Sequence, residues 1–226
     1  MNDKHGAFNQ YEYNQPIISI RSKQESQLYL ILKRSIDLVG SIVALVAFSP
    51  ILIFIALLIK LDSKGPVLFI QKRCGKNGKV FNMYKFRSMC INAEDKLQQI
   101  QHLNEAKGFM FKIKDDPRLT QIGIYIRKTS IDELPQLINI FKGEMSFVGP
   151  RPPLPNEVEK YNLWHKLRLS VKPGLTGLWQ ISGRSDLGFN DMVMLDLKYI
   201  SERNLVYDLI IILKTIPVVL RSYGAY

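Results

Sequence analysis

The pattern of hydrophobic and polar positions is dominated by one uncharged run, residues 38–59, made almost entirely of aliphatic and small side chains. As a helix this run would be about 33 Å long, enough to cross a hydrocarbon core of about 30 Å. A buried helix in a soluble core is the alternative, but such a helix would be unusually long and apolar on every face. The pattern therefore predicts a membrane helix.

Two features of this run argue against a simple span. Ser49 and Pro50 stand at its middle, where proline deletes a backbone hydrogen bond and bends a helix, and where the serine hydroxyl can satisfy part of the freed backbone. A spanning helix usually has its positive excess on one side. This run is flanked at both ends by basic residues, namely Lys33, Arg34, Lys60 and Lys64. We predict a re-entrant helix that leaves by the face it entered, with a kinked single span as the open alternative.

The rest of the chain mixes strand and helix patterns. Residues 67–73 and 79–86 are predicted to be strands, because the Asn-Gly pair between them is a strong hairpin signal. Residues 122–128 are a short apolar and basic stretch, and helices are predicted over residues 93–106, 132–141, 157–170, 191–203 and 205–220. The last of these is too short and too charged to span a membrane, which favours an interfacial amphipathic helix, with a core helix as the alternative. The predicted fold class is α+β, mainly helical and membrane-associated, with a small β-hairpin.

These patterns divide the chain into three parts. Residues 1–27 are polar and lack periodicity, so they are predicted to be a mobile arm, and they lack the apolar segment of a secretory signal. Residues 28–62 form the predicted re-entrant membrane helix. Residues 63–226 form a cytosol-facing domain that ends in the interfacial helix.

Charge and composition narrow the choice of partners. The formal net charge of +11 implies an anionic partner: nucleic acid, an anionic membrane surface or a phosphorylated substrate. No reading helix or aromatic platform is recognisable, so no nucleic-acid partner is expected. Cys74 and Cys90 have no metal-ligand spacing and the three histidines are scattered. This argues against a zinc site and for reduced thiols in a cytosol-facing protein.

Asp132 and Glu133 are adjacent carboxylates in a region otherwise rich in arginine and lysine. Helix capping is one interpretation: Ser130 with Glu133 fits a capping box, or Asp132 itself caps the helix and leaves Pro135 inside the first turn. Capping explains one carboxylate better than two. A carboxylate at a helix N-terminus with arginines nearby would stay ionised and could act as a nucleophile or a metal ligand. Local sequence leaves both interpretations open.

Candidate phosphate ligands lie in further stretches around this pair. Lys85, Arg87 and Ser88 stand at a strand end, which can hold side chains firmly, although the chain contains no P-loop signature. Arg127 and Arg151 add positive charge, and prolines on both sides restrict Arg151 to extended geometry, so little entropy is lost when its guanidinium is held. The remaining candidates lie beside Arg151 and in the glycine-rich stretch 172–184, with structural turns as the alternative: Pro150, Pro152, Thr176, Gln180 and Arg184.

Taken together, these residues resemble one family, the bacterial sugar transferases or monotopic phosphoglycosyl transferases, over roughly residues 33–220. The resemblance is carried by Lys33-Arg-Ser-Ile-Asp37, Ser49-Pro50, Lys85-Phe-Arg-Ser-Met89, Asp116-Pro-Arg118, Arg127 through Gln136, Ser146-Phe-Val-Gly-Pro-Arg-Pro152, Lys172-Pro-Gly-Leu-Thr-Gly177 and Asp208-Leu209. So many ordered blocks make it highly specific. Longer members of the family carry additional N-terminal membrane helices, and this chain resembles the short form.

The resemblance implies that residues 63–226 are a catalytic domain with its active site at the cytoplasmic face of the bacterial cell membrane. Asp132 would attack a UDP-sugar, release UMP and hold the phosphosugar, and polyprenol phosphate, such as undecaprenol phosphate, would then accept it. Glu133 is expected to assist, and Mg²⁺ beside Asp132 is the expected cofactor. Membrane lipids are further expected partners, and a homo-oligomer stays open. A non-catalytic, membrane-anchored component of a glycan-assembly complex or a basic nucleic-acid binder is the alternative function, and neither the sugar nor the pathway is implied.

Overall fold

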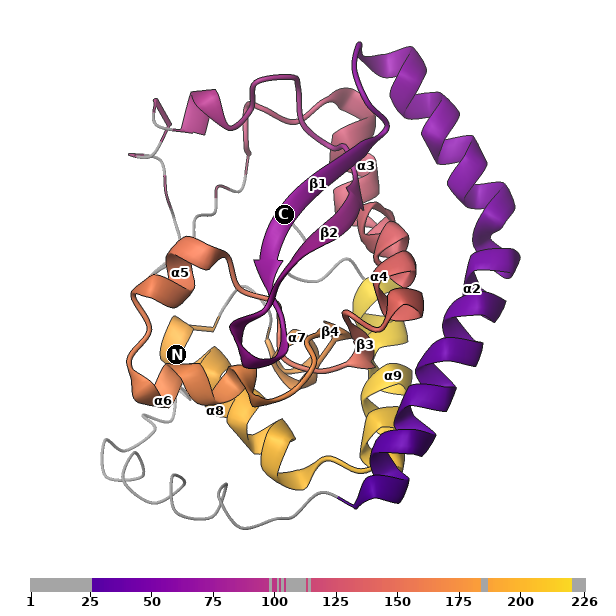
Figure 1. Ribbon diagram of the computed structural model, residues 1–226. Helices are drawn as coiled ribbons and strands as arrows, with labels where there is room; N and C mark the ends of the chain where they lie inside the picture. The colour runs from indigo at the N-terminus through magenta and orange to yellow at the C-terminus, as the bar shows by residue number, and fades with distance from the viewer. Residues whose placement is uncertain are drawn as a thin grey trace, which may run out of the picture.

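The computed structural model describes residues 26–97, 99, 100, 102, 104, 113, 115–183 and 187–220. Its longest element is helix α2 (Gln27–Asp62), which runs bowed along one side of the molecule (Figure 1). The predicted mobile arm over residues 1–27 lies almost entirely outside the described part of the chain. Every other described element lies on one side of α2 (Figure 1).

The middle of α2 has the predicted serine and proline arrangement. Pro50 lies inside the helix, where its missing N–H leaves the carbonyl of Val46 without its usual donor. The Ser49 hydroxyl donates to that same Val46 carbonyl at 2.8 Å. The expectation that the serine satisfies part of the freed backbone is therefore confirmed.

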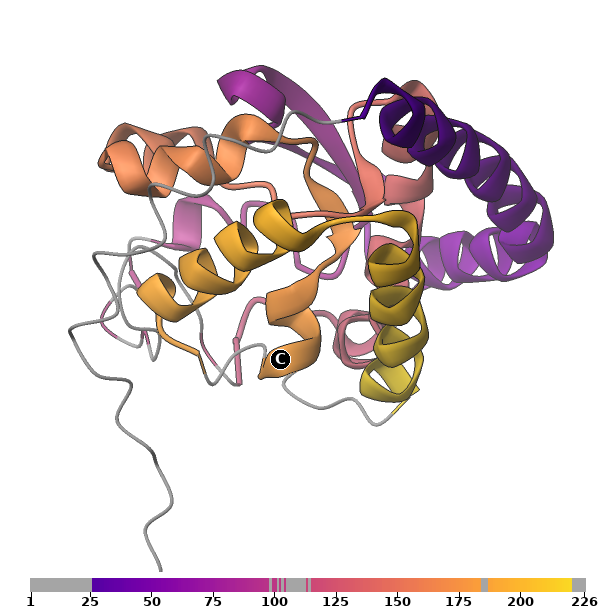
Figure 2. The ribbon, with the colours of Figure 1, turned by 90° about the horizontal axis from the view of Figure 1, so that it is seen from below.

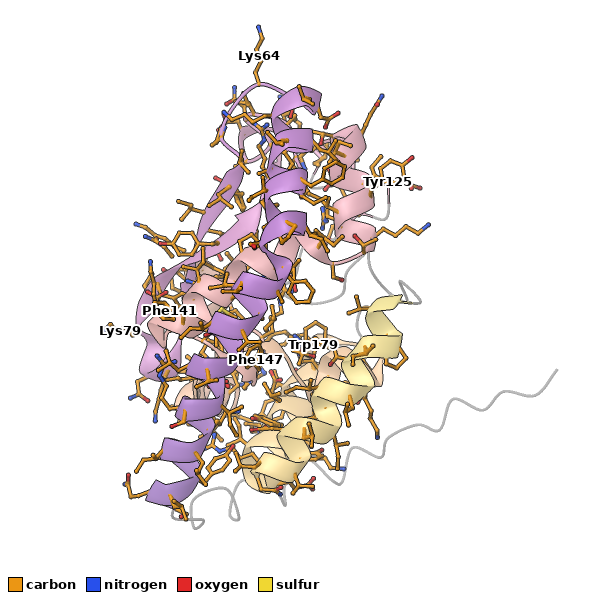
Figure 3. The ribbon with its side chains drawn as sticks, turned by 90° about the vertical axis from the view of Figure 1, so that its right-hand side faces the viewer. Lys64, Lys79, Tyr125, Phe141, Phe147 and Trp179 are labelled. Carbon is orange, nitrogen blue, oxygen red and sulfur yellow. The ribbon has the colours of Figure 1, made fainter. Side chains whose placement is uncertain are left out.

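The surface of α2 is too open for a soluble core helix. The helix is long and apolar enough to cross a membrane, and only 11% of its apolar window is buried. Figure 3 shows the side on which α2 and the C-terminal helix α9 (Leu205–Leu220) lie together. Large apolar side chains are exposed on both helices, among them Ile31, Val39, Val43, Val46, Ile53, Phe54, Leu57, Val206, Leu209 and Leu213. This surface fits a membrane anchor.

The opposite face of α2 is part of the protein core. Toward its N-terminal half, Ala44 and Leu45 pack against the buried cluster that contains Leu137 and Ile140. Toward its C-terminal end, Ile55 and Ile59 are buried in a second cluster with Phe86 and Ile126. Both halves of the helix therefore pack on the same globular body.

Strands β1 (Leu68–Cys74) and β2 (Val80–Phe86) form the predicted hairpin, paired antiparallel. Asn77 and Gly78 in the connecting turn both have positive φ, of 57° and 77°, which explains why the sequence has Asn-Gly there. The open edge of β2 is covered by Asn139, whose side chain accepts from the Tyr84 amide at 3.0 Å and donates to the Asn82 carbonyl at 2.7 Å. One buried amide side chain thus fastens the hairpin to the next helix.

A helical segment follows and lies between the hairpin and α2 (Figure 1). After the short 3₁₀ turn η3 (Asp95–Leu97), it consists of α3 (Gln121–Lys128), the 3₁₀ helix η5 (Ile131–Gln136) and α4 (Leu137–Lys142). Thr120 caps α3 by accepting from the Gly123 amide at 3.0 Å. Gly143, at a φ of 79°, ends α4 in the left-handed conformation. The predicted helix over residues 132–141 is confirmed, except that it begins as a 3₁₀ helix, whereas α3 occupies a stretch for which no element was predicted. The predicted helix over residues 93–106 is wrong for the described residues there, which form turns and η3.

The second sheet was not predicted. Strand β3 (Ser146–Val148) pairs in parallel with β4 (Gly174–Thr176), and each is too short to leave a pattern in the sequence. The crossover between them contains α5 (Pro155–Glu159), α6 (Leu163–Lys166) and the 3₁₀ helix η6 (Leu167–Ser170). The prediction of one helix over residues 157–170 is therefore wrong. Asn162 starts a new helix by accepting from the His165 amide at 2.9 Å, which breaks the segment.

The chain ends in three helices that close the core from below (Figure 2). They are α7 (Leu178–Ser182), α8 (Phe189–Glu202) and α9. The buried face of α8 packs on an aromatic cluster that includes Tyr161, Trp179 and Phe189. The inner face of α9 contributes Ile211, which is buried with Val148 and Tyr199.

Candidate active site

The two candidate carboxylates lie in η5, between α3 and α4. Asp132 is buried, with 8% of its surface exposed, whereas Glu133 is only partly buried. Ser130 has a φ of 57° and makes no side-chain cap. Ser130 stands at the predicted N-cap position but makes no side-chain capping bond, so the capping box is wrong, and Asp132 lies in the first turn and does not cap the helix. The tight turn also explains how Pro135 is accommodated so close to the helix start.

Positive side chains surround this carboxylate pair. Lys85, from β2, forms an ion pair with Glu133 at 2.6 Å. Asp132 makes no ion pair with any residue that the structure describes. Burial raises the pKa of Asp132, Lys85 and Arg127 lower it and Glu133 raises it, and together they place it at about 6. The result is a buried carboxylate, ionised at neutral pH, that no cation covers.

A buried arginine of the hairpin contacts the Gly149–Pro152 loop. Arg73, from β1, donates to the Pro152 carbonyl at 2.9 Å. Burial first, then the neighbouring Arg151 guanidinium, lower the pKa of Arg73 to about 9, and Glu133 acts in the opposite direction. Arg73 is therefore electrostatically linked to both the loop and the carboxylate pair.

Arg73 is a site residue that the sequence reasoning missed. It lies in the predicted strand 67–73, but no role was assigned to it. A signal existed in the alternation of the strand, because Gln71 and Arg73 share one face while Lys72 points to the other. Arg73 is buried, with 6% exposed, and Lys72 is exposed.

Arg87 and Ser88 are placed in a structural setting. The Arg87 guanidinium is buried and donates to the carbonyls of Ser63 and Lys64 at the C-terminal end of α2. The Ser88 carbonyl accepts from the Thr120 amide at 3.1 Å. Arg87 therefore links the hairpin to the membrane helix, and phosphate binding by these two residues stays a prediction.

The glycine-rich stretch is also held by internal bonds. The Thr176 hydroxyl bonds that of Thr215 in α9 at 2.7 Å, and the Gln180 amide contacts the Leu175 carbonyl at 3.4 Å. The Pro150 carbonyl accepts from the Gly174 amide at 2.9 Å, which joins this stretch to the Arg151 loop. Arg184 lies outside the described residues. Nucleotide binding by these residues stays a prediction.

Comparison with known proteins decides the family. The family model described as bacterial sugar transferase matches residues 28–222. The chain belongs to the bacterial sugar transferase family. The match covers α2, the hairpin, the carboxylate pair and α9, so the anchor and the candidate site are both inside it.

Several curated relatives of this bacterial sugar transferase carry functional names. It is 49% identical to the galactosyl transferase CpsE of Streptococcus agalactiae, over 92% of this chain and 46% of that protein. It is 44% identical to the exopolysaccharide production protein ExoY of Sinorhizobium fredii, over 86% and 88% of the two chains. It is also 44% identical to the undecaprenyl-phosphate galactose phosphotransferase of Salmonella typhimurium, over 86% of this chain and 42% of that protein. The chain thus spans less than half the length of two of these relatives and most of the third.

The residues of this sugar transferase have a donor set suited to Mg²⁺. No cluster of three or more His, Cys, Asp or Glu that could hold a metal is found among the described residues. Mg²⁺ does not need one, because it is commonly held by one or two carboxylates together with substrate phosphates and water. Glu133 is paired with Lys85, whereas Asp132 makes no ion pair with a described residue, so Asp132 is the carboxylate that could hold such an ion, and Mg²⁺ stays a prediction. Cys74 and Cys90 are free, as expected.

Proposed function

We propose that this bacterial sugar transferase moves a sugar 1-phosphate from a UDP-sugar to polyprenol phosphate, with undecaprenyl phosphate as the acceptor. The proposal rests on the Asp132 carboxylate, which is buried, ionised at neutral pH and not ion-paired with a described residue, although Lys85 and Arg127 act on it. The names of the relatives, which include an undecaprenyl-phosphate galactose phosphotransferase and an exopolysaccharide production protein, support the same reaction. The product would start the assembly of an exopolysaccharide, capsule or related glycan.

The proposed reaction has two displacements at one phosphorus atom. A carboxylate oxygen of Asp132 attacks the sugar-bearing phosphorus of the UDP-sugar, a new O–P bond forms, and the bond to UMP breaks with its electrons leaving on UMP. A phosphate oxygen of polyprenol phosphate then attacks the same phosphorus. The bond to Asp132 breaks, the carboxylate is restored, and polyprenyl diphosphate sugar is released. Splitting one exchange between two bulky phosphates into two steps is the advantage of a covalent nucleophile.

The surrounding residues supply charge neutralisation, which phosphoryl transfer needs more than it needs proton transfer. Lys85 and Arg127 act on Asp132 directly, as their effect on its pKa indicates. Arg151 adds charge from the loop on the far side of Arg73. Glu133 holds Lys85 at 2.6 Å, so its proposed contribution is to position Lys85 and to tune Asp132. Mg²⁺ would be held by Asp132 and would neutralise further phosphate charge when bound.

The membrane topology is part of the proposal. We place both ends of α2 on the cytoplasmic face, with the helix dipping into the bilayer and turning at Pro50. Polar contacts at both ends support this placement, because they lead to the same globular body. Near the N-terminal end, Lys33 forms an ion pair with Asp208 at 2.6 Å. At the C-terminal end, Asp62 accepts from the Ile122 amide at 3.3 Å.

Cysteine labelling tests this topology. In a variant without the native Cys74 and Cys90, cysteines introduced at Leu28 and Lys64 should both react with an impermeant reagent only in inside-out vesicles. Pro50→Ala is the matched variant, and it should move part of the population toward a true span because it restores the normal helix geometry. Labelling of the two positions from opposite sides would refute the re-entrant arrangement.

UMP release tests the reaction itself. Membrane-reconstituted protein should release UMP from at least one UDP-sugar in a panel that includes galactose, glucose and their N-acetyl forms, and release should require polyprenol phosphate beyond the first turnover. Without the acceptor, mass spectrometry should find a phosphosugar adduct on the peptide that contains Asp132. No UMP from any UDP-sugar would instead favour a non-catalytic component of a glycan-assembly complex. UMP release with an adduct elsewhere would reject Asp132 as the nucleophile.

A further inference from the structure

The Gly149–Pro152 loop has few backbone N–H groups with which to form hydrogen bonds. With Pro153 it contains three prolines, so only Gly149 and Arg151 carry a backbone N–H in this stretch. The Gly149 amide donates to the Thr176 carbonyl at 2.9 Å, and the remaining bonds that fix the loop are made to its carbonyl groups by donors from other segments. What fixes this backbone also fixes where Arg151 can reach.

Donors from outside hold successive carbonyls of the loop. The Gly174 amide binds the Pro150 carbonyl and the Cys74 amide binds the Pro153 carbonyl, both at 2.9 Å. The two carbonyls between them are bound by buried arginines. Arg73 donates to Pro152 at 2.9 Å, and Arg168 approaches the Arg151 carbonyl at 3.4 Å. The segment that carries Arg151 is thus held by a guanidinium at each of its two central carbonyls.

The two arginines differ in what compensates their charge. Arg168 is paired with Asp196, so its charge is matched inside the core. Arg73 makes no ion pair with a described residue. Its Nε and Nη2 both donate to the Gln71 side-chain oxygen, at 2.9 and 2.6 Å. A buried cation with neutral partners is costly, which makes Arg73 an expensive choice for a merely structural bond.

The charge of Arg73 also acts on the loop. Arg151 is the strongest like charge acting on Arg73, and Glu157 and then Glu133 act on it in the opposite direction. Like charges in a buried setting repel one another, and a phosphate between them and the carboxylate pair would relieve that repulsion. The arrangement is therefore incomplete without an anion.

We propose that Arg73 is a positioning residue, which fixes the Pro152 carbonyl through Nη1 and thereby holds Arg151 toward the diphosphate of the sugar nucleotide. Gln71 fixes the orientation of the Arg73 guanidinium by accepting from its Nε and Nη2. The inference rests on the proposed function, since the anion is the donor substrate of that reaction. A displacement of a charged group by about 1 Å can cost about 100-fold in rate, so the effect should be measurable.

A double-mutant cycle tests the proposal. Arg73→Met should lower kcat/KM for the UDP-sugar by roughly 10- to 100-fold, and Arg151→Ala should lower it by at least as much. Because Arg73 acts through Arg151, adding Arg73→Met to Arg151→Ala should cost no more than about twofold further. Arg73→Lys should recover part of the loss, since its amine can still donate to Pro152 but cannot make both bonds to Gln71.

Controls separate positioning from loss of charge or of fold. Lys72→Met removes one positive charge from the neighbouring, exposed position of the same strand and should leave kcat/KM unchanged. Thermal unfolding checks each variant. If Arg73→Met does not fold, Gln71→Leu takes its place in the cycle, with a smaller loss that should likewise disappear in the Arg151→Ala background.

The outcomes are distinguishable. The role of Arg73 would be overturned if the losses in kcat/KM of the two single variants multiplied in the double variant, or if Arg73→Met had wild-type kinetics. Neither result would affect the proposed reaction. A wild-type protein that releases no UMP from any UDP-sugar would instead defeat the proposed function, and the role of Arg73 with it.

Discussion

Two buried aspartates in this protein have the same elevated pKa and different surroundings. Asp132 has 8% of its surface exposed and Asp196 has 1%, and burial raises the pKa of each to about 6. Asp196 is in direct contact with Arg168, which also binds the Tyr161 hydroxyl at 3.1 Å. Asp132 is influenced by Lys85 and Arg127, yet no described residue forms an ion pair with it.

The comparison separates a structural carboxylate from a reactive one. The Asp196 carboxylate is buried in an ion pair with Arg168, which leaves no room for a phosphate group beside it. Lys85 and Arg127 act electrostatically on Asp132, but no described cation forms an ion pair with it. Its carboxylate is therefore unpaired in a positively charged site. An elevated pKa therefore does not distinguish the two aspartates, whereas an ion pair with a described residue does.

The largest effect is expected from Asp132→Asn. The amide keeps the size of the side chain but loses the nucleophile, so UMP release should fall by about a thousandfold or more. The buried charge destabilises the native state at pH 7, so the variant should be more stable by up to about 3 kcal/mol, which corresponds to the rise in pKa from 3.8 to about 6. UMP assays and thermal unfolding of the same preparation check both; robust turnover would contradict the proposed nucleophile.

The matching change at the other aspartate should act in the opposite direction on stability. Asp196→Asn leaves the charge of Arg168 buried and unpaired, so we expect a loss of roughly 3–5 kcal/mol, or about 10 °C in Tm for a chain of this size. Thermal unfolding beside Asp132→Asn gives the comparison directly. Equal shifts of the same sign in the two variants would remove the distinction drawn here.

A smaller effect is expected from Glu133→Gln. The amide can still accept from Lys85 at the observed 2.6 Å contact, but the charge that holds Lys85 is lost. UMP release should fall by roughly 100-fold, with the phosphosugar adduct on Asp132 still detectable. An adduct that is absent altogether would show that Glu133 is needed for the first displacement rather than for positioning.

The smallest effect is the pH dependence of the first displacement. Asp132 attacks as the anion and its pKa is about 6, so the rate of adduct formation should be about half maximal at pH 6 and about a tenth of maximal at pH 5. Stability should move the other way for this group: its folded pKa is raised, so the native state gains from the proton as pH falls through 6 toward 4. Omitting polyprenol phosphate removes the titration of the acceptor from the measurement. A flat profile from pH 7 to 5 would contradict an uncovered Asp132.

The elements that the sequence predicted well are those with local signals. The apolar run of α2, the Asn77-Gly78 turn and the glycine that ends α4 each act through their own neighbours in the chain. The β3–β4 pair was missed because three-residue strands leave no alternation. The break at Asn162 was missed because a cap inside an amphipathic segment is a weak signal against helical periodicity.

The site residues likewise divide into those with a local sequence signal and those whose partners are distant in the sequence. Asp132 and Glu133 were found as an unexplained carboxylate pair, and the structure adds that one is paired and the other is not. Arg73 and Arg87 carry the same charge on one hairpin, yet one binds the Arg151 loop and the other the end of α2. Those partners are far away in sequence, so spacing alone could not distinguish the two arginines.

The inner face of α2 limits how this protein can be truncated. A chain beginning at residue 63 would leave Asp208 without Lys33, and would uncover the cluster around Ile126. It would also remove Arg34, whose guanidinium binds the Ile140 and Phe141 carbonyls at 2.8 and 2.7 Å. A soluble form for crystallography or screening should therefore retain α2 and exchange only its outward side chains, such as Val43 and Ile53, for polar ones.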